Sequence, residues 1–243
     1  MTQVKLGDKN IPFIYQGNEL LYPNPVKDGL VLYYDMKGTS NNSQYKNTLK
    51  DISGNNSDAV LENFNYTSES GYSEKGLKFD GVDDYISSVN SIKRNSKDIT
   101  IEISLDDLDK KQNWQYLVTL KNKNNSYYIG VLIHYEQVDV YINNNVSIQH
   151  SYYTIKNDEK HIVVTLTGDE EIEQKVYIDG KLMPLNGGEI TSNISGMDNE
   201  LVFHRTNNDK NKSSMKSLRL YDRILTEQEI QYNYNLEKER WGL

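Results

Sequence analysis

The chain has 243 residues, and its 27 Lys and Arg against 35 Asp and Glu give a formal net charge of −8. This charge argues against nucleic acid or an anionic membrane as a partner, since either needs a basic footprint on the protein. The absence of cysteine excludes disulfide scaffolds, thiol catalysis and cysteine-ligated metal centres, and no apolar run approaches the roughly 18 residues that membrane insertion needs.

Residues 1–27 differ from the rest of the chain because they hold three of the four prolines, Pro12, Pro23 and Pro25. X-Pro steps favour extended or turn backbone, and the scattered apolar residues follow neither a strand nor a helix period. We expect an extended N-terminal arm that packs on the domain or on a neighbouring protein. A loosely held terminus is the alternative.

From residue 28 onward, short runs rich in β-branched and aromatic residues alternate with turns rich in Asn, Gly, Asp and Ser. The predicted strands cover 30–35, 76–81, 84–88, 99–105, 116–120, 127–134, 138–142, 161–167, 175–180, 200–204 and 217–222. Apolar and polar residues alternate cleanly along 99–105, the pattern of a half-buried strand. NNN (143–145) and IDGK (178–181) are hairpin signals, since Asp-Gly accommodates positive φ angles. Residues 28–243 are therefore predicted to form one all-β jelly-roll sandwich.

One helix is predicted near the end of the chain, over residues 226–238. Thr226 is a good N-cap residue, and Glu229 completes a capping box with it. Leu225 and Ile230 are placed to form a hydrophobic staple around the cap. Ile230, Tyr234 and Leu236 then give an apolar stripe that can lie on the sandwich, and Trp241 can hold the tail.

Five segments of the chain together resemble a known family. They are DISGNNSDA (51–59), GLKFDGVDDYIS (76–87), HIVVTLTGD (161–169), KVYIDGKLM (175–183) and SLRLYDRILTEQEI (217–230). In this order they resemble a laminin-G-like, concanavalin A-type jelly roll of the bacterial and phage branch that is also related to pentraxins. The resemblance implies a fold but no activity, because this fold hosts lectins, adhesion modules and hydrolases. Many relatives carry an Asp just before the last strand, where this chain has Lys216.

The N-terminal stretch 4–35 resembles the start of tail or minor structural proteins from phages of low-GC Gram-positive bacteria. This resemblance implies a virion protein whose residues 1–27 attach it to other virion proteins, while the jelly roll faces the host or neighbouring subunits. The N-terminus lacks the apolar stretch of a signal peptide, so we expect the protein to be made in the bacterial cytoplasm and to reach the outside within the virion.

Hydrolysis is not expected. Glycoside hydrolases of this fold carry an alternating Glu-x-Asp-x-x-Glu run, which supplies the carboxylates that flank the scissile bond, and the chain has no such run. The nearest segments are EISLDD (102–107), in which Ser104 separates Glu102 from Asp106, and the turn-like DEEIEQ (169–174). Catalytic serine, histidine-metal and nucleotide-binding motifs are also absent, and His161 is expected to be a structural residue at a strand edge. A polysaccharide hydrolase of the same fold stays open as an alternative.

Calcium is the cofactor that the sequence leaves open. Hard cations take oxygen ligands from carboxylates and loop carbonyls, and Asp51, Asn55 and Asp58 cluster in one predicted turn while Asp83 lies in another. The resemblance implies that the first Asp of this motif lies near a bound calcium in relatives. The alternative is that these residues make Asx turns, their most common role.

Residues 113–153 combine aromatic and amide side chains, as lectin-type sites do. Such sites stack the apolar faces of a sugar on rings and bind its hydroxyls with planar polar groups. The candidate carbohydrate-binding residues are Trp114, Tyr128, His134, Asp139, Tyr141, Asn143 and Tyr152. The alternative is that these tyrosines are half-buried strand residues with a structural role.

These observations predict a non-catalytic phage virion protein, associated with the tail or baseplate, whose jelly roll binds a host cell-surface polysaccharide. Several copies, in the virion or in a homo-oligomer, would raise its affinity by multivalency. The alternative is an assembly or decoration protein that binds no glycan.

Overall fold

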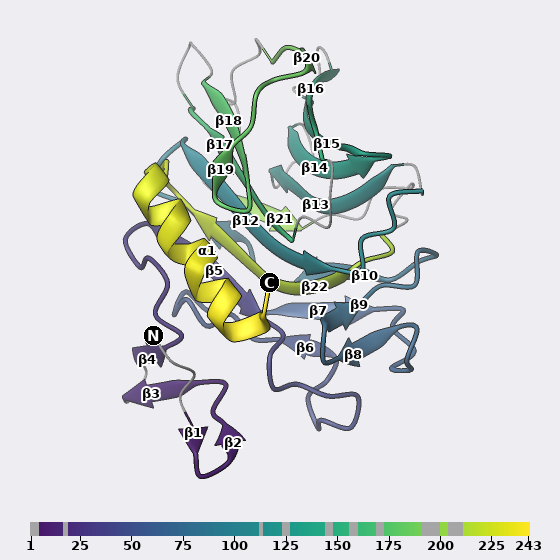
Figure 1. Ribbon diagram of the computed structural model, residues 1–243, viewed down its shortest axis with the longest axis vertical. Coiled ribbons are helices and arrows are strands. Elements are labelled where there is room, and N and C mark those ends of the chain that lie inside the picture. Colours follow the sequence, from purple (N-terminus) through teal and green to yellow (C-terminus); the bar gives the residue numbers. More distant parts are fainter. Residues whose placement is uncertain are drawn as a thin grey trace.

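The computed structural model describes residues 5–16, 19–111, 114–122, 127–143, 148–155, 160–168, 173–190, 200–203 and 211–243. Within these residues, two large antiparallel sheets form a sandwich, and a C-terminal helix packs on the outer side of one of them (Figure 1). The prediction of an all-β jelly-roll sandwich with an N-terminal arm and a short C-terminal helix is confirmed.

The larger sheet has eight strands in the described part of the chain. In spatial order it runs β19 (Lys181–Leu182), β18 (Gln174–Ile178), β17 (His161–Leu166), β12 (Ile99–Asp106), β22 (Ser214–Tyr221), β9 (Gly76–Lys78) and β8 (Gly71–Ser73), and β5 (Leu30–Asp35) also pairs with β22. The chain turns from β18 into β19 at Asp179 and Gly180, which have φ angles of 49° and 76°. The hairpin predicted at IDGK is therefore confirmed, and it ends β18 before the predicted residue 180.

The second sheet has seven described strands. In spatial order they are β11 (Ile92–Lys93), β21 (Glu200–Phe203), β13 (Gln115–Asn122), β14 (Tyr128–His134), β15 (Gln137–Asn143), β16 (Ile148–Thr154) and β20 (Gly187–Gly188). A small third sheet contains β10 (Tyr85–Ser88), β7 (Ala59–Glu62) and β6 (Thr48–Leu49). The predicted turn at 143–145 falls partly outside the described residues, which omit 144–147.

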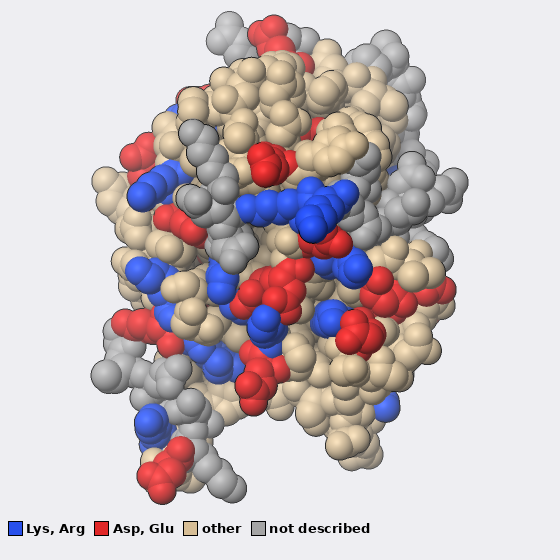
Figure 2. Space-filling model, turned by 45° about the vertical axis from the view of Figure 1, so that its right-hand side comes forward, with Lys and Arg blue, Asp and Glu red and all other residues tan. Residues whose placement is uncertain are grey.

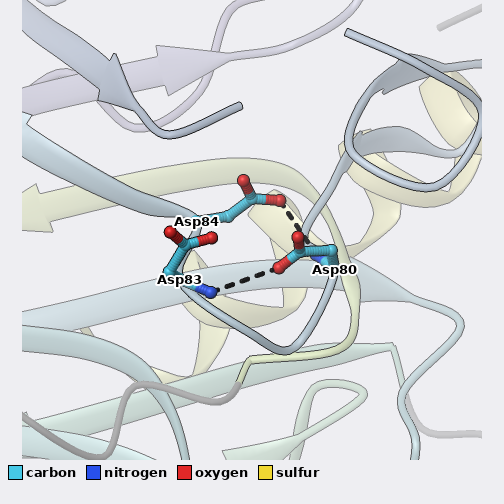
Figure 3. A group of neighbouring side chains, drawn as sticks. All are labelled: Asp80, Asp83 and Asp84. Atoms are coloured by element: carbon cyan, nitrogen blue, oxygen red, sulfur yellow. Dashed lines mark hydrogen bonds between the residues drawn. The ribbon is translucent and has the colours of Figure 1, made fainter. Parts of the chain in front are cut away.

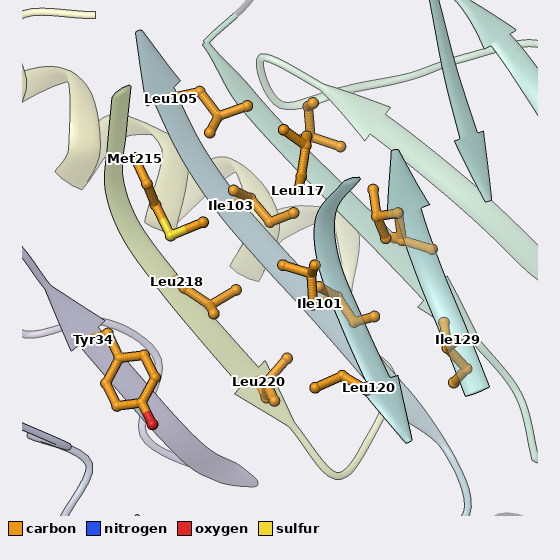
Figure 4. Close-up of a cluster of buried hydrophobic side chains, with 14 of the residues drawn as sticks. Tyr34, Ile101, Ile103, Leu105, Leu117, Leu120, Ile129, Met215, Leu218 and Leu220 are labelled. Carbon is orange, nitrogen blue, oxygen red and sulfur yellow. The ribbon is translucent and has the colours of Figure 1, made fainter. Parts of the chain in front are cut away.

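The core lies between the two large sheets (Figure 4). Its buried side chains include Ile101, Ile103, Leu105, Leu117, Leu120, Ile129, Met215, Leu218 and Leu220. Each such aliphatic side chain contributes about 1.5–3 kcal/mol when it leaves water. The alternation predicted for 99–105 is confirmed, but its polar side is not solvated. Thr100, Glu102 and Ser104 are buried as well, because the C-terminal helix covers that side of β12.

The helix, α1 (Glu227–Trp241), begins with the predicted capping box. The Thr226 side chain accepts a hydrogen bond from the Glu229 amide, and the Glu229 carboxylate accepts one from the Thr226 amide at 2.8 Å. The predicted end at residue 238 is wrong. The helix continues to Trp241 because the residue that can adopt the left-handed capping conformation, Gly242 with a φ of 66°, comes only there.

The buried side of α1 is more polar than the sequence predicted. Its buried residues are Ile230, Asn233, Leu236, Glu237 and Arg240, and Tyr234 is only half-buried. The polar members are buried because the outer side of the eight-stranded sheet supplies their partners. Asn233 donates to Glu102 at 2.8 Å and Arg240 binds Asp35 at 2.6 Å.

The N-terminal arm forms two small hairpins beside α1 (Figure 1). They are β1 (Lys5–Leu6) with β2 (Lys9–Asn10), and β3 (Ile14–Gln16) with β4 (Glu19–Tyr22). The Arg240 guanidinium donates to the Pro12 carbonyl at 3.0 Å and lies over the Phe13 and Tyr22 rings. Across the part of the chain that the structure describes, no helix is long and apolar enough to cross a membrane.

Candidate functional site

The side of β14, β15 and β16 that points away from the core carries the residues that the sequence singled out. Alternation places Ile129, Val131 and Ile133 in the core, so Tyr128 and His134 point outward. The register pairs Tyr128 with Asn143, Leu132 with Asp139, Asp139 with Tyr152, and Tyr141 with His150. We call the outward set the aromatic face: Trp114, Tyr128, His134, Asp139, Tyr141, Asn143, His150 and Tyr152. All seven predicted sugar-binding residues lie on it, and their role in sugar binding stays a prediction.

Five rings contact one another in series at this face. The Tyr135 and His134 centroids are 4.9 Å apart, and His134 stacks on Trp114 at 4.3 Å with 17° between the planes. Trp114 meets Tyr141 edge-on at 6.2 Å, and Tyr141 stacks on His150 at 5.1 Å. These are the stacked and edge-to-face arrangements that aromatic pairs favour. They join the five rings into one connected aromatic cluster on the outer side of the sheet.

Trp114 covers the middle of the aromatic face. Leu132 is fully buried and Asp139 is only 2% exposed, although both point away from the core. The indole contacts His134, two residues beyond Leu132, and Tyr141, two residues beyond Asp139, so it lies over the Leu132–Asp139 pair. Trp114 is itself 39% exposed and has a φ of 59°, a left-handed conformation that large residues seldom adopt. Such conformations cluster at ligand-binding sites.

Asp139 is a buried carboxylate with little compensation for its charge. Its Oδ1 has no hydrogen-bond partner among the described residues, and its Oδ2 lies 3.8 Å from His134 Nδ1. Burial raises the pKa of Asp139 to about 6. Burial, together with the nearby Asp139 charge, also raises the pKa of Tyr141 to about 12. The aromatic face therefore holds a carboxylate, Asp139, whose charge a bound ligand could compensate.

Gly130 is a buried residue on the same face. It pairs with Tyr141 on β15, and a Cβ added there would lie 3.6 Å from Tyr116 Cε1 and 3.7 Å from Tyr141 Cβ. Any longer side chain would stand between these two tyrosines. Gly130, Tyr116 and His150 were not among the predicted sugar-binding residues. Strand alternation could have found His150, because it shares its side of β16 with Tyr152.

The predicted calcium residues Asp51, Asn55 and Asp58 form hydrogen bonds to backbone groups in and around their turn. Asp51 Oδ1 accepts hydrogen bonds from the amides of Tyr33 and Ser53 at 3.0 and 2.9 Å, and its Oδ2 accepts one from Ser57 at 3.0 Å. Asp58 accepts from the Asp51 amide and pairs with Lys50. Asn55 donates to the Leu30 and Val31 carbonyls. The two carboxylates hold a turn here, as the alternative interpretation expects, and calcium at these residues stays a prediction.

Asp83 lies apart from them, in a group with Asp80 and Asp84 (Figure 3). One carboxylate oxygen from each of the three lies within 4.8 Å of the others. Asp84 is buried, and it accepts hydrogen bonds from the Ser70 hydroxyl at 3.1 Å and the Asp80 amide at 2.9 Å. Burial is the main reason that the pKa of Asp84 rises to about 6. Of these three carboxylates, the predicted calcium candidate was Asp83, and calcium at Asp83 stays a prediction.

The carboxylates weighed for hydrolysis lie on the opposite side of the sandwich, under and beside α1. Glu102 is buried and accepts from His161, Arg219 and Asn233, each at 2.8 Å. Burial alone would raise the pKa of Glu102, but the Arg219 charge and these hydrogen bonds lower it. His161 is thus a buried structural residue. The segment 169–174 lies mostly outside the described residues.

Lys216, which stands where many relatives have an Asp, is buried and pairs with Asp106 at 2.8 Å. Burial works against ionisation of Asp106, but the hydrogen bonds from Lys216 and the Asp107 amide, together with the Lys216 and Lys160 charges, outweigh burial and lower the Asp106 pKa. Glu102 and Asp106 are therefore committed to internal ion pairs, which leaves neither poised to exchange protons with a substrate.

Charged side chains are unevenly distributed over the surface. Figure 2 shows Lys, Arg, Asp and Glu gathered across the middle of the molecule, while uncharged residues dominate its upper part, where Figure 1 places β14, β15 and β16. This part of the surface is therefore formed more by uncharged side chains than by charged ones.

The family model described as "Concanavalin A-like lectin/glucanases superfamily" matches residues 80–231. No curated protein sequence matches the chain significantly. A Trypanosoma rangeli sialidase in complex with 2,3-difluoro-KDN resembles it with a TM-score of 0.58 and 15% identity, over 88% of this chain and 33% of that one.

Two receptor binding domains also resemble the chain. That of the botulinum neurotoxin C/D mosaic serotype has a TM-score of 0.55 and 14% identity, over 86% of this chain and 52% of that one. That of botulinum neurotoxin type G has a TM-score of 0.54 and 17% identity, over 86% and 52%. The chain thus spans about half or less of these proteins, and at such identities the likeness shows a shared fold.

Proposed function

The chain belongs to the concanavalin A-like lectin/glucanases superfamily, and from this premise we propose that it is a non-catalytic glycan-binding protein that uses its aromatic face. The observation that carries the proposal is the outward series of Trp114, His134 and Tyr141 rings, with Asp139 beneath and Asn143 beside them. The apolar CH faces of sugars stack on such rings, and their hydroxyls bind planar polar groups. Because His134 and Tyr141 stand on paired strands and Trp114 packs against both, little entropy is lost when a ligand binds.

The same arrangement favours binding over hydrolysis. Glycoside hydrolysis requires two carboxyl groups, about 5–5.5 Å apart in retaining enzymes and about 6.5–9.5 Å apart in inverting ones. The aromatic face, as defined by its described residues, contributes one carboxylate, Asp139. Glu102 and Asp106 belong to ion pairs on the other side of the sandwich. A hydrolase would need a second acid that this face does not supply from those residues.

The finer proposal is that the ligand is a host cell-surface polysaccharide and that the protein works in a phage tail or baseplate, attached by residues 1–27. Two features support it. The arm docks on α1, on the side of the sandwich opposite the aromatic face, and presents the exposed apolar residues Leu6 and Tyr15. Receptor binding domains of two botulinum neurotoxins share the fold. Several copies in one particle would convert weak single contacts into strong attachment.

The test is glycan binding by the full-length protein, measured on a glycan array and then by calorimetry. Trp114→Ala and Tyr141→Ala are expected to weaken binding about tenfold or more, which corresponds to a loss of about 1.4 kcal/mol. Tyr45→Ala is the matched control, because Tyr45 is an exposed tyrosine outside the aromatic face. Binding that survives both aromatic-face substitutions would overturn the proposed site. Absence of any glycan binding, together with a stable oligomer, would favour the assembly alternative.

A further inference from the structure

We infer that the aromatic face selects a positively charged ligand, an ammonium-bearing saccharide such as an amino sugar, over neutral and acidic saccharides. The inference rests on the proposed function, since it names the class of glycan bound at the same face. It comes from a comparison of Asp139 with the other buried carboxylates of the chain.

Three other buried carboxylates of this protein have cationic partners, and a fourth, Asp84, accepts hydrogen bonds from the Ser70 hydroxyl and the Asp80 amide. Glu102 is bound by Arg219 at 2.8 Å, Asp35 by Arg240 at 2.6 Å, and Glu237 also by Arg219. This is the usual situation, because an uncompensated buried charge is costly. Asp139 is as buried as these groups, yet His134, at 3.8 Å, is the one basic side chain within 4 Å of it among the described residues. A cation from outside the chain would supply the missing counter-charge.

The surroundings of Asp139 match that cation. The Trp114 and Tyr141 rings meet at 70°, which forms a corner above the carboxylate. Ring faces attract ammonium groups, Trp most strongly, and the attraction grows when water is excluded. The carboxylate beneath adds a counter-charge in a region of low dielectric. A neutral sugar can use the rings but leaves the charge uncompensated, and an acidic sugar is repelled by it.

No direct contact between the ligand and Asp139 is needed. The indole covers the carboxylate, so an ammonium group on the outer side of Trp114 and Tyr141 would act on it through space. Among the described residues, the groups that face Asp139 from the neighbouring elements are Leu132 and His134 of β14, Tyr152 of β16, and Trp114 ahead of β13. None of them carries a permanent positive charge. The net charge of −8 acts in the same direction at longer range.

The experiment compares matched ligands on the full-length protein by calorimetry at pH 7. Glucosamine oligomers are compared with N-acetylglucosamine oligomers of equal length, and with oligogalacturonate as the acidic saccharide. Choline is compared with 3,3-dimethyl-1-butanol, a neutral molecule of the same shape, because the choline charge does not titrate. Each ammonium-bearing ligand is expected to bind about tenfold tighter than its neutral counterpart, the ratio to which 1.4 kcal/mol corresponds, and oligogalacturonate is expected to bind more weakly than the neutral oligomers.

Asp139→Asn keeps the shape of the side chain and removes its charge, so the preference for the ammonium form should fall to about one. Asp107→Asn, at an exposed carboxylate outside the aromatic face, should leave the preference unchanged. Equal binding of neutral and charged ligands, or a preference that survives Asp139→Asn, would overturn the inference while the proposed function stands. If no saccharide binds, the proposed function fails as well.

Discussion

Glu102 and Arg219 occupy registered positions on β12 and β22, and Arg219 Nη1 donates to Glu102 Oε1 at 2.8 Å. The same guanidinium binds Glu237 of α1 and donates to the Tyr33 hydroxyl of β5 at 3.2 Å. One buried side chain thus connects two neighbouring strands with the C-terminal helix. This relationship explains how a helix with few apolar residues on its inner side stays attached to the sheet.

The first prediction follows from this contact. Arg219→Met should destabilise the protein by about 3–5 kcal/mol, because it leaves Glu102 and Glu237 buried without their cation. Urea unfolding followed by circular dichroism measures the change. Lys75→Met is the control, since the Lys75–Asp107 pair is exposed and such pairs contribute less than about 1 kcal/mol. Equal effects of the two substitutions would show that Arg219 does not hold the helix.

The second prediction concerns the stability cost of Asp139. Burial raises the pKa of this carboxyl to about 6, from about 3.9 in an unfolded chain. The folded state therefore disfavours the ionised form. The protonated Asp139 carboxyl therefore contributes its full stabilisation of the folded state below about pH 4, and this contribution is lost as the pH rises through 6. Asp139→Asn should accordingly stabilise the protein above pH 6, by up to about 3 kcal/mol at 1.36 kcal/mol per unit.

The measurement for Asp139→Asn is the difference in unfolding free energy between the variant and the natural protein at pH 7.5 and at pH 4. The difference should be large at the higher pH and close to zero at the lower one. A variant that is less stable at pH 7.5 would show that the carboxylate has a favourable partner after all. If Asp139→Asn both stabilises the protein and removes its preference for ammonium-bearing ligands, the Asp139 carboxylate serves binding at a cost in stability.

Strand alternation was enough to place Tyr128, His134, Asp139 and Tyr141 on one side of the sheet, because a period of two fixes which residues share a face. The position of Trp114 over Asp139 could not be predicted. It depends on the left-handed φ of Trp114 and on the register of β14 against β15, neither of which has a local sequence signal.

The inner side of α1 shows the same limit. The capping box at Thr226 and Glu229 is a local pattern, and it predicted where the helix begins. The burial of Glu237 and Arg240 depends on partners about 20 to 200 residues away, Arg219 and Asp35. Hydrophobic periodicity counts such residues as exposed, so it favoured Tyr234 in their place.

The third prediction tests the turn at Asp51. Asp51→Ala removes the acceptor of three backbone amides, and it should cost about 2 kcal/mol. If this carboxylate only holds the turn, the melting temperature falls equally in EDTA and in millimolar calcium. If it binds calcium, the natural protein is stabilised by calcium and the variant is not.

Asp83→Asn provides the parallel test for the group with Asp80 and Asp84. A ligand of the folded state raises stability by about 2.7 kcal/mol at a hundredfold excess over its Kd. If this group binds calcium, the Asp83→Asn protein should lose that stabilisation.

The fourth prediction concerns Gly130. This residue lies within β14 and has no left-handed φ, and a Cβ there makes only ordinary contacts with Tyr116 and Tyr141. Gly130→Val should therefore fold, since a β-branched residue suits a strand, with a melting temperature close to that of the natural protein. Its methyl groups would stand between the two tyrosines and should weaken glycan binding about tenfold, as a loss of 1.4 kcal/mol would.

Gly130→Ala is the matched control for that experiment, because it adds only the Cβ and should leave most of the binding intact. Calorimetry with the tightest glycan from the array, alongside thermal unfolding of both variants, separates blocked binding from lost structure. Unchanged binding by a folded Gly130→Val protein would show that the ligand does not enter between Tyr116 and Tyr141. The Trp114 end of the aromatic face, over Asp139, would then be the part that makes contact.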